Sequence, residues 1–131
     1  MRAQYLQDWI VDPDFPLSWR LQRERAGSGA LGDIGAHVID ATQFVLDDLL
    51  TGVSGLTETV IRDRPGGSVT VDDCALFLGR FSAGAVATFE ATRLATGRKN
   101  GLRFEINGSA GSLAFDLEKL NELWYYDQAE D

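Results

Sequence analysis

The stretch GSGALGDIGAHVID, residues 27–40, decides how the rest of the chain is interpreted. Its first six residues, 27–32, match the G-x-G-x-x-G pattern of a dinucleotide-binding turn. The residues that follow place Asp33, His37 and Asp40 at helical spacing, which is typical of a reaction site rather than a phosphate-binding turn. These two interpretations require different surroundings, so the flanking sequence can distinguish between them.

The dinucleotide interpretation fails in its surroundings. A buried apolar strand should lead into the first glycine, and an acidic residue should end the next strand about 20 residues later. The segment before the glycines, residues 20–25, reads RLQRER and is too charged for the central strand of a parallel sheet. We therefore expect the glycines to form a tight approach to the N-terminus of a helix.

Residues 31–46 have the periodicity of an α-helix. One apolar stripe consists of Ile34, Val38, Ala41 and Val45. A neighbouring stripe consists of Asp33, His37, Asp40 and Phe44. Because Ile39 and Leu46 fall on a third side, we expect little of this helix to face water and the helix to be the most buried one of the domain.

After Gly52 the helical period gives way to short β-rich segments. These segments are residues 53–62, 74–81, 85–92, 102–107, 112–117 and 122–127. Turn sequences separate them, and such short connections join antiparallel strands. We also expect a strand at 3–11, a turn at 12–16 and a short extended segment at 17–21. The sequence thus predicts an α+β fold, with an open, mostly antiparallel five- to six-stranded sheet. One main helix, and a short second one near residues 117–120, would lie on one face.

Length and composition indicate one globular domain. The 131 residues suffice for a single core, and 44% hydrophobic with 24% charged residues is ordinary for a soluble protein. The net charge of −8 argues against binding of nucleic acid. No apolar run approaches the roughly 18 residues of a membrane span, and the start lacks a signal-peptide pattern. The lone Cys74, in an apolar run, indicates a buried thiol in a reducing cytoplasm.

Asp33 and His37 form a candidate acid–base pair, because side chains at i and i+4 project from one side of a helix. An imidazole exchanges protons near neutral pH, and Asp40 could hold the ring from the other side. Structural roles stay open, since Asp33 could cap the helix and an isolated histidine can belong to the core. A metal site is less favoured because no further ligands have suitable spacing. A serine triad lacks its G-x-S-x-G turn.

Residues 29–40, GALGDIGAHVID, resemble the signature of the C-terminal domain of the Gfo/Idh/MocA oxidoreductases, which are sugar and inositol dehydrogenases and their relatives. The resemblance continues through Trp19 and Arg20 and through residues 95–100, 105–113 and 116–123. It implies an α+β domain whose sheet carries the helix on one face. It also implies that the open face packs against a second subunit, so a homo-oligomer is expected.

The resemblance implies roles for the candidate residues. Asp33 and His37 occupy the D-x-x-x-H positions of the family, where the histidine takes the hydroxyl proton as hydride leaves the same carbon. The aspartate would contact the substrate, and Asp40 would support the histidine from within the helix. The implied substrate-binding residues are Trp19, Arg20, Arg98, Lys99 and Asn100. Taken alone, Trp19 could equally be a core aromatic and Lys99 a solvated loop charge.

The chain departs from full-length members of that family, which carry an N-terminal Rossmann domain and often a Glu-Lys-Pro lysine. Lys99 and Lys119 lie outside such a motif. We therefore expect residues 1–131 to be a single substrate-binding and oligomerisation domain, inactive alone and holding no cofactor or metal. In the intact enzyme, the missing domain would bind NAD or NADP.

The resulting prediction is the substrate-binding domain of an NAD(P)-dependent sugar or polyol dehydrogenase that acts on a secondary alcohol. The alternative is a stand-alone α+β dimerisation or ligand-binding module without catalysis. The sequence leaves open the identity of the substrate, the choice between NAD and NADP, and the direction of the reaction.

Overall fold

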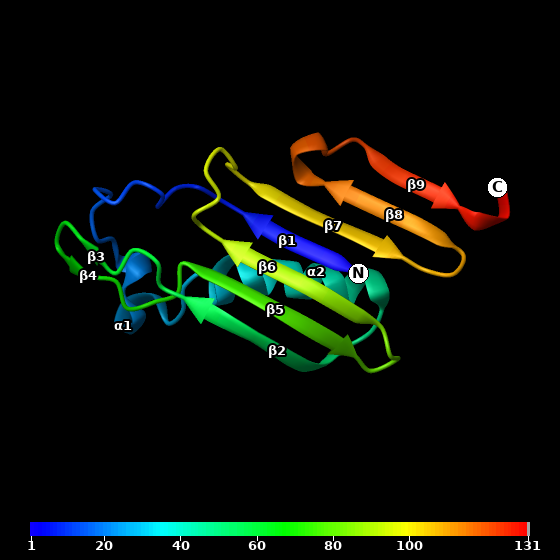
Figure 1. Ribbon diagram of the computed structural model, residues 1–131, viewed down its shortest axis with the longest axis horizontal. Coiled ribbons are helices and arrows are strands. Elements are labelled where there is room, and N and C mark those ends of the chain that lie inside the picture. The colour runs from blue at the N-terminus through cyan, green and yellow to red at the C-terminus, as the bar shows by residue number, and fades with distance from the viewer. Residues whose placement is uncertain (131) are drawn as a thin grey trace.

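The computed structural model describes residues 1–130. Their main feature is a seven-stranded sheet, and helix α2 (Ala36–Leu46) lies across one face of it (Figure 1). The strands lie in the order β2-β5-β6-β1-β7-β8-β9. Their bounds are β1 Arg2–Leu6, β2 Leu50–Glu58, β5 Cys74–Phe81, β6 Val86–Thr92, β7 Gly101–Asn107, β8 Gly111–Asp116 and β9 Leu123–Asp127. A separate hairpin joins β3 (Asp63–Arg64) to β4 (Gly67–Ser68).

The predicted α+β class with an open sheet is confirmed. Every neighbouring pair in the seven-stranded sheet is antiparallel except β1 with β6, so the sheet is mostly antiparallel as expected. The strand count exceeds the predicted five or six because the N-terminal strand and all six later β-rich segments join the same sheet. No helix among residues 1–130 is long and apolar enough to cross a membrane.

The main helix spans the predicted residues but begins with a π-helical turn, Leu31–Gly35, labelled η2, that runs directly into α2. Its hydrogen bond joins the amide of Gly35 to the carbonyl of Ala30 at 2.8 Å. The remaining helical segments are short. They are α1 (Arg23–Ala26) and the 3₁₀ turns η1 (Trp19–Leu21), η3 (Leu117–Lys119) and η4 (Gln128–Glu130). The turn η3 lies where the second short helix is predicted.

Two local predictions are wrong. The extended segment at 17–21 is instead the turn η1, closed by a 3.1 Å hydrogen bond from the amide of Leu21 to the carbonyl of Ser18. This turn buries Leu21 completely, which an extended path does not require. The first strand ends at Leu6 rather than at residue 11, because the chain leaves the sheet and turns between Asp8 and Val11.

The expectation that α2 is buried on nearly all sides is also wrong, because only one side of the helix meets the sheet. Val38 and Thr42 are buried there, whereas Phe44 is 85% exposed and Val45, a member of the predicted apolar stripe, is 39% exposed. Thr42 tolerates burial because its hydroxyl donates a 2.6 Å hydrogen bond to the carbonyl of Val38. Asp33, which lies in η2, and His37 are on the uncovered side.

The core between helix and sheet is small and well defined. Val38 packs against residues from neighbouring strands, and these are Ala3, Phe81, Ala87 and Phe89. A separate apolar cluster fills the space beneath the loops and consists of Ile10, Leu21, Val69 and Val71. The start of the helix rests on a third cluster, made of Ala30, Ile34, Ala75 and Ala91. Small residues dominate that third cluster, so the helix start lies close to β5 and β6.

Asp72 fixes the glycine-rich turn to the segment before β5. Its carboxylate accepts hydrogen bonds from the amides of Gly29 (3.0 Å) and Leu31 (2.7 Å), and its carbonyl accepts one from Ala30 (2.9 Å). A Cβ at Gly29 would overlap the backbone oxygen of Asp72, so this position must be glycine. Gly27 has a φ of 77°, in the left-handed region that favours glycine. The glycines thus provide the tight approach that the sequence suggests.

Gly29→Ala should therefore destabilise the fold, because the added methyl group meets backbone that cannot move aside. We expect the free energy of unfolding to fall by roughly 2 kcal/mol, measured by chemical denaturation. Gly52→Ala is the matched control, because a Cβ there meets nothing within 4 Å. The control should change stability by less than about 0.5 kcal/mol, and equal losses in both variants would contradict this role for Gly29.

Candidate active site

A cavity of about 490 Å³ lies where the start of the main helix meets the chain that follows β1. Its lining residues are Tyr5, Gln7, Trp9, Phe15, Ser18, Arg20, Asp33, Ile34 and His37. Three of the residues predicted from the sequence, Arg20, Asp33 and His37, are therefore brought together at one cavity. Asp33 and His37 are one helical turn apart, whereas Arg20 lies 13 positions before Asp33 and reaches the cavity through the tertiary fold.

His37 presents an accessible imidazole to this cavity rather than a ring enclosed by the core. The Tyr5 ring lies beside it, with 6.2 Å between ring centroids and an angle of 58° between planes. Asp33 lies one turn earlier, in the π-helical turn, and its side chain is 47% exposed. A carboxylate and an imidazole that reach the same cavity can bind a hydroxyl group and accept its proton.

Arg93 holds the Asp33 carboxylate, and sequence reasoning missed it. Its Nη2 lies 2.6 Å from Oδ2 of Asp33 and also donates to the carbonyl of Gly29 at 3.3 Å. The Arg93 side chain is only 2% exposed, and its guanidinium carbon lies 5.2 Å from the centroid of the Trp9 ring. In the sequence, Arg93 is marked only as a single cationic residue directly after the β-rich segment 85–92. Because Asp72 bonds the free amides, Asp33 is not the helix cap.

Several buried polar atoms near the cavity lack partners among residues 1–130. They are Oγ of Ser18, Nε and Nη1 of Arg93, and Oδ1 of Asp73. Burial raises the pKa of Asp73, although the amides of Val60 and Ile61 donate to its other oxygen and oppose this effect. Ser18 also lines the cavity, but its unpartnered Oγ is itself buried.

In the loop predicted to bind substrate, residues 98–100, each side chain already contacts another residue of the chain. Lys99 pairs with Asp8 at 2.7 Å, and Arg98 pairs with Glu118 at 2.8 Å. The Lys99 hydrogen bond keeps the pKa of Asp8 below its ordinary value. Asn100 accepts a 2.6 Å hydrogen bond from the hydroxyl of Tyr5. None of Arg98, Lys99 and Asn100 lines the cavity, but Asn100 accepts hydrogen bonds from two lining residues, Tyr5 and Gln7.

The two other predicted residues lie outside the cavity lining. Trp19 is partly exposed, and the Arg20 guanidinium carbon lies 4.6 Å from its ring centroid. Asp40 is exposed on α2, and within residues 1–130 no hydrogen bond or ion pair joins it to His37. Among the same residues, no cluster of three or more histidine, cysteine or acidic side chains could hold a metal ion.

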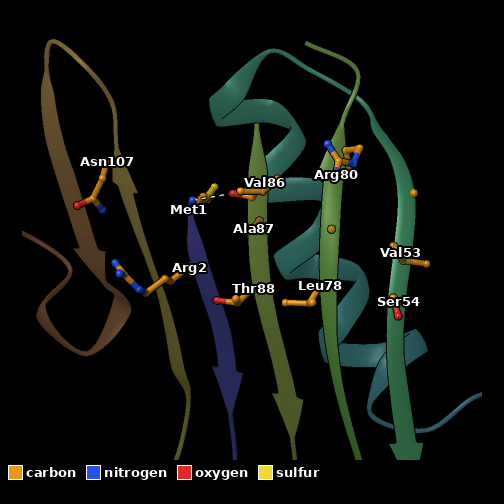
Figure 2. Close-up of a pocket in the computed structure, with 12 residues that line it drawn as sticks. Met1, Arg2, Val53, Ser54, Leu78, Arg80, Val86, Ala87, Thr88 and Asn107 are labelled. Atoms are coloured by element: carbon orange, nitrogen blue, oxygen red, sulfur yellow. Dashed lines mark hydrogen bonds between the residues drawn. The ribbon is translucent and has the colours of Figure 1, made fainter. Parts of the chain in front are cut away.

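A larger hollow, of about 790 Å³, lies on the open face of the sheet, opposite α2. Figure 2 shows Arg2, Leu78 and Thr88 on neighbouring strands of this surface. Its charged side chains are Arg2 and Arg80, and neither a carboxylate nor the imidazole lines it. Because it lacks groups for acid–base chemistry, we assign the candidate active site to the smaller cavity.

Comparison with known proteins decides the family. Residues 1–114 match the model described as the GFO/IDH/MocA C-terminal domain. The chain belongs to the GFO/IDH/MocA family. The resemblance seen in the sequence is thereby confirmed.

Relatives within the GFO/IDH/MocA family include dehydrogenases of known structure. Levoglucosan dehydrogenase of Pseudarthrobacter phenanthrenivorans is 43% identical over 93% of this chain and 36% of its own length. A solved structure of a levoglucosan dehydrogenase, in complex with NADH and levoglucosan, has 46% identity and a TM-score of 0.95 over 99% of this chain and 35% of its own. An oxidoreductase domain protein from Kribbella flavida has 62% identity and a TM-score of 0.96, over 99% of this chain and 36% of its own. The chain thus spans about a third of the length of these relatives.

The Arg93–Asp33 pair leads to an asymmetric prediction. We expect Asp33→Ala to lower the free energy of unfolding by about 3 kcal/mol, because it removes the carboxylate that is hydrogen-bonded to a buried guanidinium. Arg93→Met should cost less, about 1–2 kcal/mol, because water can solvate the half-exposed carboxylate that remains.

Chemical denaturation of both variants measures this difference. Arg2→Met is the control, because it removes a surface ion pair with Glu105 and should cost less than about 1 kcal/mol. A larger loss for Arg93→Met than for Asp33→Ala would show that the two charges are not coupled as described.

Proposed function

We propose that this chain is the substrate-binding domain of an NAD(P)-dependent sugar or polyol dehydrogenase that exchanges hydride with a secondary alcohol. The observation that carries the proposal is the joint presence of Asp33 and His37 at one accessible cavity in a member of this family. The similarity to levoglucosan dehydrogenase supports a sugar or polyol as the substrate. The alternative, a stand-alone dimerisation or ligand-binding module without catalysis, has no comparable observation in its favour.

In this proposal His37 accepts the proton of the hydroxyl group that is oxidised. Asp33 is held through Oδ2 by Arg93, which leaves its other oxygen free to accept a hydrogen bond from the substrate. Arg20, at the same cavity, can donate to substrate oxygens because a guanidinium only donates. Asp40, exposed on the same helix, would have only a supporting electrostatic role.

The glycine-rich turn does not fit a dinucleotide. The amides of Gly29, Ala30 and Leu31 are already bonded to Asp72, and the amide of Gly32 is bonded to the Ser28 hydroxyl. No amide of this set remains to bind a pyrophosphate. We therefore propose that NAD or NADP is held by a Rossmann domain outside these residues, and that this chain alone has no activity.

We further propose that the open face of the sheet packs against a second copy of the chain. Exposed apolar side chains on the adjacent strands β5 and β6 support this, and they are Leu76, Leu78 and Val86. Burying three such side chains contributes several kcal/mol to association. A cytoplasmic location is proposed as well, supported by the unpaired thiol of Cys74.

Leu78→Glu tests the packing of the open face, since a carboxylate there opposes burial. We expect sedimentation to show a dimer of the natural chain and a monomer of the variant. Leu123→Glu is the control, because Leu123 is similarly exposed but pairs with Phe115 on the other face. A monomeric natural chain would contradict the proposed dimer.

His37→Asn tests the catalytic proposal. Residues 1–131 would replace the matching segment of the P. phenanthrenivorans levoglucosan dehydrogenase, and turnover of levoglucosan with NAD would be measured. We expect kcat to fall by at least about 100-fold, with the thermal unfolding midpoint unchanged because His37 is exposed.

Asp47→Asn is the control in the same chimera. Asp47 ends α2 with a φ of 48°, a conformation that asparagine adopts readily, so activity should stay near the starting value. Near-normal turnover of the His37 variant would exclude a proton-transfer role. A folded but inactive chimera with the natural sequence would instead favour the module without catalysis.

A further inference from the structure

A chain of hydrogen bonds runs along the wall of the candidate cavity, outside the Asp33–His37 pair. The indole nitrogen of Trp9 donates to Oε1 of Gln7 at 3.1 Å. Nε2 of Gln7 donates to Oδ1 of Asn100 at 3.4 Å, and the hydroxyl of Tyr5 donates to the same oxygen at 2.6 Å. Tyr5, Gln7 and Trp9 all line the cavity that contains His37.

The direction of this chain follows from Trp9. An indole N–H can donate a hydrogen bond but cannot accept one, so Gln7 must turn its amide oxygen toward Trp9. Its amide nitrogen then faces Asn100, which must offer its own oxygen in return. The Tyr5 hydroxyl donates its single proton to the Asn100 oxygen. Toward a ligand, the Tyr5 oxygen can therefore only accept a hydrogen bond, through its lone pairs.

The segment that precedes Asn100 is held in place by contacts with other parts of the protein. Lys99 is paired with Asp8, which also accepts a 3.1 Å hydrogen bond from the amide of Gly97, and Arg98 is paired with Glu118. These contacts restrain residues 97–99, the part of the loop that leads directly into Asn100. Arg98 and Lys99, which the sequence associates with substrate, would therefore act as positioning residues.

We propose that Tyr5 is a specificity-determining residue that accepts a hydrogen bond from a second, free hydroxyl of the sugar or polyol. That hydroxyl lies beside the one that meets His37, because the Tyr5 and His37 rings share the cavity with 6.2 Å between their centroids. A substrate with an ether or carbonyl oxygen at that position cannot donate and is rejected. This proposal rests on the proposed function, and it adds the requirement for a free neighbouring hydroxyl.

Titration of the full 131-residue chain with levoglucosan and its monodeoxy analogues tests the proposal, with binding followed by ¹H–¹⁵N NMR. Tyr5→Phe should weaken binding of levoglucosan by about 5- to 10-fold, the effect of one hydrogen bond. For the one analogue that lacks the partner hydroxyl, Tyr5→Phe should have no effect. That selective loss is the expected result, because a general structural defect would weaken every ligand alike.

Two Asn100 variants test the direction of the hydrogen-bond chain. Asn100→Asp keeps an oxygen that accepts from Tyr5 and Gln7, so it should bind levoglucosan within about 2-fold of the natural chain. Asn100→Leu frees the Tyr5 proton, so it should lose affinity for levoglucosan and gain relative affinity for the analogue in which a carbonyl replaces the partner hydroxyl.

The outcomes separate the two proposals. Equal losses for all ligands in Tyr5→Phe, or no loss at all, would overturn the role of Tyr5 while leaving the proposed function intact. A natural chain that binds none of these sugars, together with an inactive chimera, would count against the proposed function itself. Loss of binding in Asn100→Asp equal to that in Asn100→Leu would overturn the polarity argument.

Discussion

The contact between Asp72 and the glycine-rich turn positions everything else at the candidate site. One residue satisfies three backbone amides at the start of the main helix, where helices leave their amides without intrahelical partners. A carboxylate is also favoured there by the helix dipole. The close approach requires glycine at position 29, and it brings Ala30 and Ile34 onto Ala75 and Ala91. These contacts fix the helix start relative to β5 and β6, and none of them involves the side chain of Asp33 or His37.

A second constraint follows from this placement, because the fixed helix start brings Asp33 over the end of β6. There the buried Arg93 meets the carboxylate of Asp33 and the carbonyl of Gly29. A buried cation needs a partner, since an uncompensated charge in the interior is strongly unfavourable. Asp33 thus serves stability and orientation together, and the fold and the site share one ion pair.

Local patterns in the sequence predict much of this fold. The helical period over residues 31–46 and the alternation of residues such as 102–107 are local properties, and both elements lie where predicted. Thr42 and Val45 show where the apolar pattern fails to predict burial. Thr42 is buried because its hydroxyl bonds to the helix backbone, whereas the apolar Val45 is exposed. The partners Asp72 and Arg93 lie more than 40 positions from the residues that they hold, and no periodicity reveals such contacts. The same limit applies to the G-x-G-x-x-G match, whose meaning depends on Asp72.

Trp9 connects the two halves of the site, although its sequence context suggests only a strand. Its ring lies 5.2 Å from the Arg93 guanidinium carbon, and the Phe15 ring meets it edge-on at 5.5 Å. Its N–H donates to Gln7 and so begins the chain that ends at Tyr5. One side chain therefore supports the cation that orients Asp33 and is also the donor that sets the polarity of Tyr5. Since an arginine and an indole N–H both donate only, neither orientation depends on the pH near neutrality. Among the residues that the structure describes, the imidazole of His37 and the second oxygen of Asp33 have no hydrogen-bond partner at this cavity, and these are the two groups that the proposed proton transfer uses.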